Sequence, residues 1–152
     1  MRKSCVATAI VLAVGIGIAL DASAQQRKPE DYLKMRKSAF TVMSWNFGVL
    51  GAMVKGQRPY DQTEAVMRAE AVSLVSHLPF EGFVKGTESG DTRARPEVWE
   101  QPDKFKANAE RLQSETAKLV ETAKSGDPAQ LKTQFGATAK ACSNCHDDFR
   151  KK

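Results

Sequence analysis

The chain has 152 residues, of which 41% are hydrophobic and 27% are charged, and its formal net charge is +5. This length suits one domain with a single core, and the sequence contains no internal repeat that would indicate a second domain. The basic residues are spread along the chain except at Arg150–Lys152, and without a clustered basic face or an aromatic platform a nucleic-acid-binding protein is excluded.

Residues 1–24 have the pattern of an export signal. A basic start is followed by an apolar run over residues 6–20 and by Ala22-Ser23-Ala24, which has the small residues of a cleavage site. We therefore expect residues 25–152 to form the mature protein in the periplasm, without attachment to a membrane. An uncleaved membrane anchor is the alternative, although the apolar run is short for one.

Between Pro29 and about Lys55, apolar residues recur at helical spacing, which predicts one long helix. Pro29 is favoured in a first helical turn, and Gly56 ends the pattern. The residues expected on the inward face are Arg36, Phe40, Met43, Phe47, Leu50 and Val54.

A second helix is expected from Asp61, whose carboxylate can cap the first turn, to Pro79, which stops it. Its expected inward face carries Met67, Ala71, Leu74, Val75 and Leu78. Residues 79–102 then contain many glycine, proline and charged residues and no clear periodicity. A connection of this length predicts a crossover that contributes to a site, unless an element has been missed.

Two further helices are expected at residues 103–124 and from Asp127-Pro128 onward, separated by Gly126. The third helix has an expected inward face of Phe105, Ala109, Leu112, Thr116, Leu119 and Ala123, and the fourth one of Leu131, Phe135, Thr138, Cys142, Cys145 and Phe149. Four helices with short, long and short connections predict an all-α fold, an antiparallel four-helix bundle.

The fourth helix contains the segment Cys142-Ser143-Asn144-Cys145-His146, which has the spacing of a covalent haem attachment site. On a helix these two thiols and the imidazole lie at positions i, i+3 and i+4 and therefore project from one face. Each thiol can add to one vinyl group while His146 ligates iron. We predict one covalently bound haem c between the helices, near one end of the bundle.

Two other interpretations of the cysteine pair are weaker. A zinc site would need a second pair of ligands, whereas His77 stands alone in the sequence. A dithiol redox motif normally opens a helix within a βαβ unit, whereas this pair lies near the end of an amphipathic helix.

With these segments, the chain resembles the cytochrome c′ family, the high-spin c-type cytochromes built on a four-helix bundle. The resemblance covers nearly all of residues 25–152. It rests on the C-terminal haem motif with Arg150, on Lys28–Asp31 with Arg36, on the turn Lys55–Tyr60, and on Gly86–Trp99. Around residues 92–94 the chain has two residues more than the commoner pattern of the family.

The resemblance implies a five-coordinate iron, with His146 on the proximal side and no protein ligand on the distal side. Phe40 stands where a related low-spin group has an axial methionine, and its ring would leave room only for a diatomic gas. From the sequence alone, core packing is the more usual role of an aromatic residue at such a position. Met43, one turn further on, and His77 are the alternative iron ligands.

Other positions acquire roles only through the resemblance. Arg36, Lys37 and Asp91 match family positions close to the haem propionates, although Lys37 replaces what is often an amide. Phe80 stands where the family often has a tryptophan that packs on the haem. Arg150 matches a basic residue beside the proximal imidazole, and a solvated C-terminal arginine is the simpler alternative.

Two functions remain open. The first is a gas-binding haem protein that takes up nitric oxide and, more weakly, carbon monoxide; in the family, nitric oxide can displace the proximal histidine, a step that Arg150 would assist. The second is a soluble electron carrier that exchanges electrons with redox partner proteins in a respiratory or photosynthetic chain. We do not expect an enzyme, because Phe40 offers no acid or base. The family is commonly homodimeric through its first two helices.

Overall fold

The computed structural model describes residues 27–152, so the expected export signal at residues 1–24 lies outside the described residues. The helices are α1 (Pro29–Val54), α2 (Gln62–Val75), the 3-10 helix η1 (Leu78–Gly82), α3 (Glu97–Glu100), α4 (Pro102–Ser125) and α5 (Pro128–Phe149). The four expected helices are confirmed, and the long connection contains the two short elements η1 and α3.

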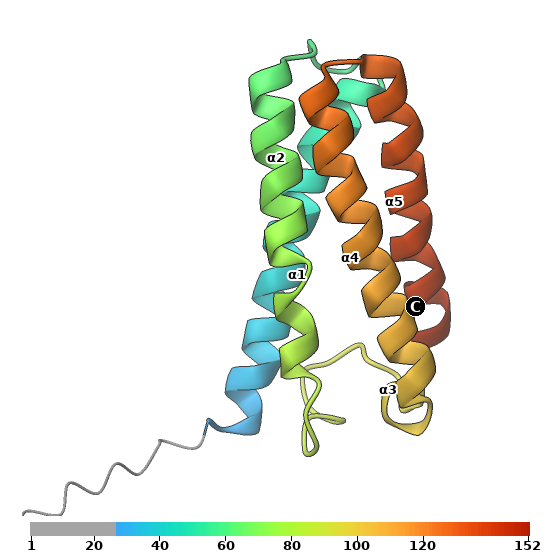
Figure 1. The fold of residues 1–152 in the computed structure, drawn as a ribbon. Coiled ribbons are helices and arrows are strands. Elements are labelled where there is room, and N and C mark those ends of the chain that lie inside the picture. Colours follow the sequence, from blue (N-terminus) through green and yellow to red (C-terminus); the bar gives the residue numbers. More distant parts are fainter. Residues whose placement is uncertain (1–26) are drawn as a thin grey trace, which may run out of the picture.

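The four long helices run alternately in opposite directions and form an antiparallel four-helix bundle (Figure 1). The two short connections lie at one end of the bundle, and the long connection lies at the other end, where α5 finishes. Within residues 27–152 the only β-type pairing is an isolated bridge between Ala94 and Arg150. The prediction of an all-α fold is therefore confirmed.

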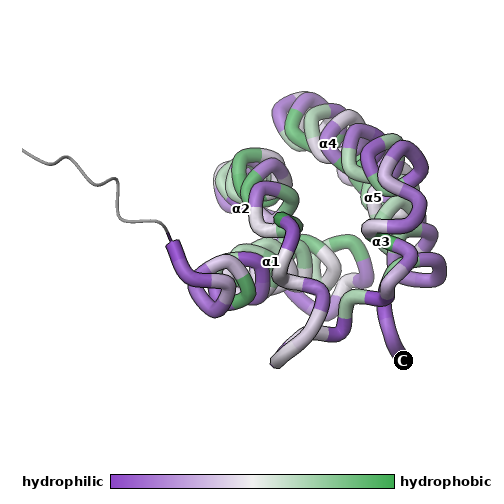
Figure 2. Tube along the Cα trace, turned by 90° about the horizontal axis from the view of Figure 1, so that it is seen from below, coloured by the Kyte–Doolittle hydropathy of each residue, from purple (hydrophilic) through white to green (hydrophobic). Residues whose placement is uncertain are grey.

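The bundle consists of two helix pairs, α1 with α2 and α4 with α5, which Figure 2 shows in a view along the bundle. The α2 helix also packs against α4, whereas α1 and α5 touch each other at few positions. Residues of α1 and residues of α5 therefore approach a common site from opposite helix pairs.

The helix ends follow from local side-chain chemistry. The carboxylate of Asp61 accepts a hydrogen bond from the backbone N–H of Glu64, and that of Asp127 accepts bonds from the N–H groups of Ala129 and Gln130. These bonds satisfy donors that have no partner inside a helix. The α4 helix ends at Gly126, whose φ of 73° lies in the left-handed region that glycine adopts without steric cost.

The core has two parts. The cluster near the short connections contains Leu50, Met53, Ala65, Ala69, Leu119, Val120, Ala123 and Leu131. A second cluster, nearer the haem motif, contains the buried residues Met43, Val72, Leu112 and Ala141, with Phe40, Phe80 and Cys142 packed against it. Every residue on the inward faces expected for α1, α4 and α5 is buried or half-buried, as predicted, and many of these residues lie in or beside the two clusters.

The inward face expected for α2 is wrong at most positions, although Val75 packs against the second cluster. Its buried residues are Ala65, Ala69 and Val72, whereas Met67 is 52% exposed and Leu74 is 74% exposed. Polar and apolar residues are mixed around α2 without one clearly apolar side, so hydrophobicity alone does not select an inward side. The buried side of α2 carries small alanine side chains, which let the helix approach its neighbours closely. The size of the side chains therefore decided which side of α2 faces inward.

No helix within residues 27–152 combines the length and the apolar character needed to span a membrane.

Candidate functional site

The haem motif lies on α5, close to the end of the bundle that carries the long connection. Cys142 and Cys145 are free thiols and are both half-buried. Cys142 contacts the same core cluster as Phe40 on α1 and Phe80 on η1. The structure thus brings together three predicted site residues from three separate elements.

The surroundings of the two cysteines are apolar. Burial raises the pKa of the Cys142 thiol. Burial, with smaller contributions from Cys142 and Asp148, raises the pKa of Cys145 to about 11. Both groups are therefore neutral thiols near pH 7, whereas the reactive cysteine of a dithiol redox motif has a lowered pKa. This environment argues against the redox interpretation of the pair.

His146 follows Cys145 directly and is exposed to solvent. Nevertheless, partial shielding of the imidazole by neighbouring atoms lowers its pKa, and the cations of Arg150 and Arg93 add to this effect against the opposing charge of Asp147. These influences favour the neutral imidazole, which is the form that ligates metals.

Six aromatic side chains form a continuous group next to the motif, which we call the aromatic cluster: Phe40, Phe80, Phe83, Trp99, Phe105 and Phe149. Phe40 and Phe80 meet edge to face with their ring centroids 6.3 Å apart. The centroid of Phe105 lies 5.6 Å from that of Phe80 and 5.2 Å from that of Phe149. The cluster therefore links α1, the long connection, α4 and α5, and it supplies the apolar surroundings that a large flat cofactor requires.

Arg36 is a buried cation that projects from α1 toward the long connection. It is only 3% exposed. Its Nη1 donates to Thr87 Oγ1 at 3.2 Å, and its Nη2 donates to the Thr87 carbonyl at 3.1 Å and to Thr92 Oγ1 at 3.2 Å. The guanidinium also lies 4.2 Å from the ring centroid of Phe83. Burial lowers the pKa of Arg36, and the nearby charge of Glu88 opposes this effect.

Two buried hydrogen-bond donors at this end of the bundle, the guanidinium of Arg36 and the indole N–H of Trp99, suit the propionate carboxylates of a haem. A buried cation is stable only when hydrogen bonds and an opposite charge compensate for the loss of water. Arg36 has three hydrogen-bond acceptors, but none of them is a carboxylate. The buried indole N–H of Trp99 has no partner within residues 27–152. The guanidinium carbon of Arg36 lies 5.9 Å from the Trp99 ring centroid. Neighbouring donors of this kind suit a propionate, so the residues present fit the group that the cysteine motif implies.

The other predicted propionate residues, Lys37 and Asp91, form an ion pair with each other. Their side chains are 56% and 88% exposed, respectively. An exposed pair of this kind contributes little to stability. Lys37 follows Arg36 directly in the chain, so the ion pair of Lys37 and Asp91 lies at the same end of the bundle as Arg36.

Sequence patterns did not reveal the partners of Arg36 or the extent of the aromatic cluster. Thr87 is fully buried, accepts from Arg36 and donates from Oγ1 to the Val84 carbonyl at 2.7 Å. It lies in a connection without periodicity, so no pattern marked it as buried. The indole of Trp99 likewise enters the site only because the long connection folds back beneath the bundle.

A four-helix bundle with a Cys-x-x-Cys-His motif on its last helix, facing apolar and cationic side chains, defines a c-type haem protein. The family model for cytochrome C′ matches residues 31–150. The chain therefore belongs to the cytochrome c′ family, whose members carry a covalently bound haem c.

Known relatives agree over most of the chain. Cytochrome c′ of Alcaligenes xylosoxydans xylosoxydans is 41% identical over 128 residues, which is 84% of this chain and 99% of the relative. The crystal structure of cytochrome c′ from Rubrivivax gelatinosus matches with a TM-score of 0.79 at 40% identity and covers 82% of this chain and 98% of that chain. A nitric oxide complex of an Alcaligenes xylosoxidans cytochrome c′ variant matches with a TM-score of 0.78 at 41% identity and covers 82% and 97% of the two chains.

Gly82 permits the close approach of η1 to Arg36. A Cβ at Gly82 would lie 3.0 Å from the carbonyl oxygen of Tyr32 and closer still to Cγ of Arg36. We predict that Gly82→Ala lowers the free energy of unfolding by about 1–3 kcal/mol through overpacking. The control Gly48→Ala, which meets nothing within 4 Å on α1, should be neutral or stabilising by up to about 1 kcal/mol. Thermal unfolding followed by circular dichroism measures both, and equal midpoints for the two variants would contradict the prediction.

Proposed function

We propose that this protein is exported to the periplasm after removal of residues 1–24 and that residues 25–152 bind nitric oxide and carbon monoxide at an open face of a five-coordinate haem. It acts by binding and not as an enzyme. The observation that carries this proposal is the place of Phe40, a side chain without a donor atom, in the apolar cluster that also contains Cys142. A hydrocarbon ring at this position limits access by size and leaves the iron without a second protein ligand.

In this proposal the residues of α5 hold the cofactor. Cys142 and Cys145 form the thioether links to one haem c, and His146 is its axial ligand. The bound haem supplies the iron, which takes up the gas. Arg150 belongs to the proximal pocket, where its cation lies close enough to influence the His146 imidazole.

Residues outside α5 orient the haem. Arg36 binds a propionate, with Lys37 and Asp91 beside it, and the unpartnered indole N–H of Trp99 supports a propionate at this place. Phe80 packs on the ring, as its contacts with the aromatic cluster suggest. These side chains exclude water and keep the ring plane in one orientation.

The alternative iron ligands receive less support. Met43 is 8% exposed and packs in the core with Val72 and Leu112, which is the usual role of a methionine on a helix face. His77 is solvent-exposed between α2 and η1. The relative from Alcaligenes xylosoxidans whose nitric oxide complex has been solved supports gas binding in this chain.

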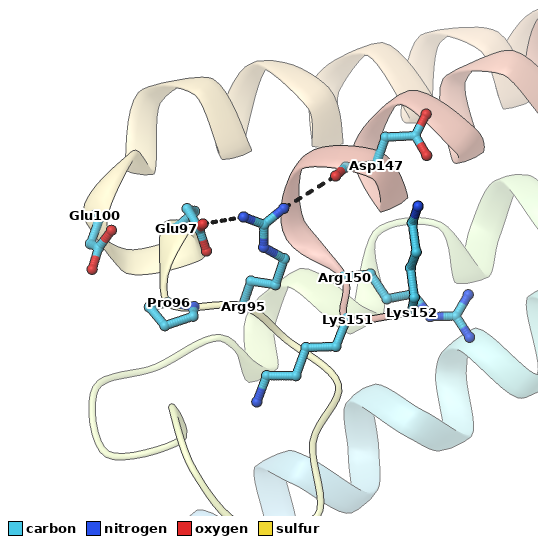
Figure 3. A pocket seen from close by; sticks show the side chains of 8 residues that line it. All are labelled: Arg95, Pro96, Glu97, Glu100, Asp147, Arg150, Lys151 and Lys152. Carbon is cyan, nitrogen blue, oxygen red and sulfur yellow. Dashed lines mark hydrogen bonds and ion pairs between the residues drawn. The ribbon is translucent and has the colours of Figure 1, made fainter.

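Electron transfer to redox partner proteins is the second candidate function. It is favoured by a small excess of basic side chains in a surface pocket at the end of α5. Carboxylates of Glu97, Glu100 and Asp147 line this pocket together with four basic side chains, Arg95, Arg150, Lys151 and Lys152 (Figure 3). Such charges attract an acidic partner to the end of the bundle that contains the haem motif. An iron with two fixed protein ligands suits a carrier better, because its geometry then stays constant between oxidation states.

A homodimer is also part of the proposal. All the large hydrophobic side chains that are exposed within residues 27–152 lie on α1, on α2 or at the start of η1: Val42, Trp45, Met67, Leu74 and Leu78. Trp45 is 72% exposed and Leu74 is 74% exposed. Exposed apolar side chains confined to one helix pair indicate an interface, and a second copy of the chain matches the family's use of these helices.

The optical spectrum of the purified holoprotein tests the main proposal. We expect a thioether-linked haem with a high-spin ferric spectrum, because only His146 coordinates the iron. Nitric oxide added to the ferrous protein should shift the spectrum. A low-spin spectrum at rest that does not respond to nitric oxide would contradict gas binding and favour the electron carrier.

Replacing Phe40 tests its role in the distal pocket. We predict that Phe40→Ala raises carbon monoxide affinity on the order of tenfold, equivalent to about 1.4 kcal/mol of relieved steric cost. The control Phe47→Ala removes an identical ring from the same helix. Phe47 stacks on Phe135 with the ring centroids 4.2 Å apart, so this variant should lower the stability of the protein without changing its carbon monoxide affinity. Carbon monoxide titration measures both, and equal affinities for Phe40→Ala and the unmodified protein would remove Phe40 from the pocket.

The proposed interface is tested by placing a charge in it. We predict that Trp45→Glu raises the dissociation constant of the dimer about 30-fold or more, since central aromatic side chains typically contribute at least about 2 kcal/mol. The control Ala137→Glu adds the same charge to an exposed position on α5 and should leave the dimer intact. Sedimentation velocity measures the association. A monomeric unmodified protein, or equal dissociation constants for the two variants, would refute the interface.

A further inference from the structure

We infer that a short backbone pairing between residues 93–95 and residues 149–151 positions Arg150 beside His146. We call this pairing the clasp. The inference rests on the proposed function, in which Arg150 belongs to the proximal pocket. It concerns a segment of the long connection that lies far from the haem motif in the sequence.

The clasp consists of three hydrogen bonds around the antiparallel bridge between Ala94 and Arg150. The N–H of Arg95 donates to the Phe149 carbonyl at 3.0 Å, and the N–H of Lys151 donates to the Arg93 carbonyl at 2.8 Å. The side chain of Arg93 adds a bond from Nη2 to the Lys151 carbonyl at 2.9 Å. These bonds hold the backbone immediately before and immediately after Arg150.

This arrangement matters because Arg150 is where the chain leaves α5. Its φ of −124° and ψ of 133° are extended, and its N–H still donates to the carbonyl of His146. The clasp fixes the backbone of Arg150 at the turn of α5 that contains His146, so that an exposed arginine becomes a cation in a defined place.

The clasp is itself anchored at two points. Arg95 donates from Nη1 to the Asp147 carbonyl at 3.3 Å and pairs with Glu97, as Figure 3 shows. On the other side, Thr92 Oγ1 accepts both from Arg36 at 3.2 Å and from the N–H of Ala94 at 3.1 Å. The segment that receives the buried guanidinium of Arg36 therefore continues directly into the pairing with Arg150.

Lys151→Pro removes one bond of the clasp. Proline has no N–H, so the bond to the Arg93 carbonyl is lost. The extended conformation of Arg150 is the one that a residue preceding proline prefers, so the variant introduces no strain there. Lys152→Pro is the matched control, because it removes the same charge while the Lys152 N–H makes no hydrogen bond to any described residue.

Two measurements on the haem-loaded protein decide the matter. In Lys151→Pro, the Arg95 amide should exchange its hydrogen roughly tenfold faster, because the remaining bond of the bridge opens more often. The ferrous nitric oxide complex should convert from six- to five-coordinate iron more slowly by roughly three- to tenfold, the effect of one lost hydrogen bond. Arg150→Ala should slow this conversion at least as much, the double variant Arg150→Ala/Lys151→Pro should be no slower than Arg150→Ala, and Lys152→Pro should behave as the unmodified protein.

The outcomes separate this inference from the proposed function. If Arg150→Ala slows the conversion while Lys151→Pro does not, the clasp does not position Arg150, and the proposed function stands. If neither variant changes the conversion, Arg150 has no proximal role and the inference fails with it. If the unmodified protein binds no nitric oxide, the proposed function fails, and equal Arg95 exchange in Lys151→Pro and Lys152→Pro would then still refute the clasp.

Discussion

The burial of one cation, Arg36, organises the end of the bundle that carries the haem motif. A guanidinium with 3% exposure needs acceptors in place of water, and the long connection supplies them through Thr87 and Thr92. For this reason the connection folds back beneath the helices. Gly82, which lies against Arg36, shows how closely η1 must approach α1 for this arrangement to form.

The two ends of the bundle serve different purposes. At the short connections, Leu50, Leu119 and Leu131 are fully buried in an aliphatic cluster of the kind that stabilises helical bundles. At the opposite end the packing is aromatic, and it includes half-buried thiols, a buried cation and an unpartnered indole N–H. Aliphatic packing is thus concentrated at the first end, and the groups that suit a cofactor lie at the second.

The proposed selection among ligands rests on shape and not on hydrogen bonding. Phe40 and Phe80 come from α1 and from the long connection, yet their rings meet edge to face. Hydrocarbon rings offer no proton to a bound gas and no donor atom to a metal. Discrimination at such a site depends on clearances that the rings set, and these clearances depend on how firmly the long connection is held.

The sequence by itself determined the elements and the attachment chemistry, because helix periodicity, caps and the cysteine spacing are local properties. It specified the four helices, the inward faces of α4 and α5, and the common face of Cys142, Cys145 and His146. It did not determine which side of α2 faces inward, since polar and apolar residues are mixed around this helix and the small residues Ala65 and Ala69 occupy its buried side. Only the tertiary structure decided the partners of Arg36, because a connection without periodicity reaches its contacts through long-range packing.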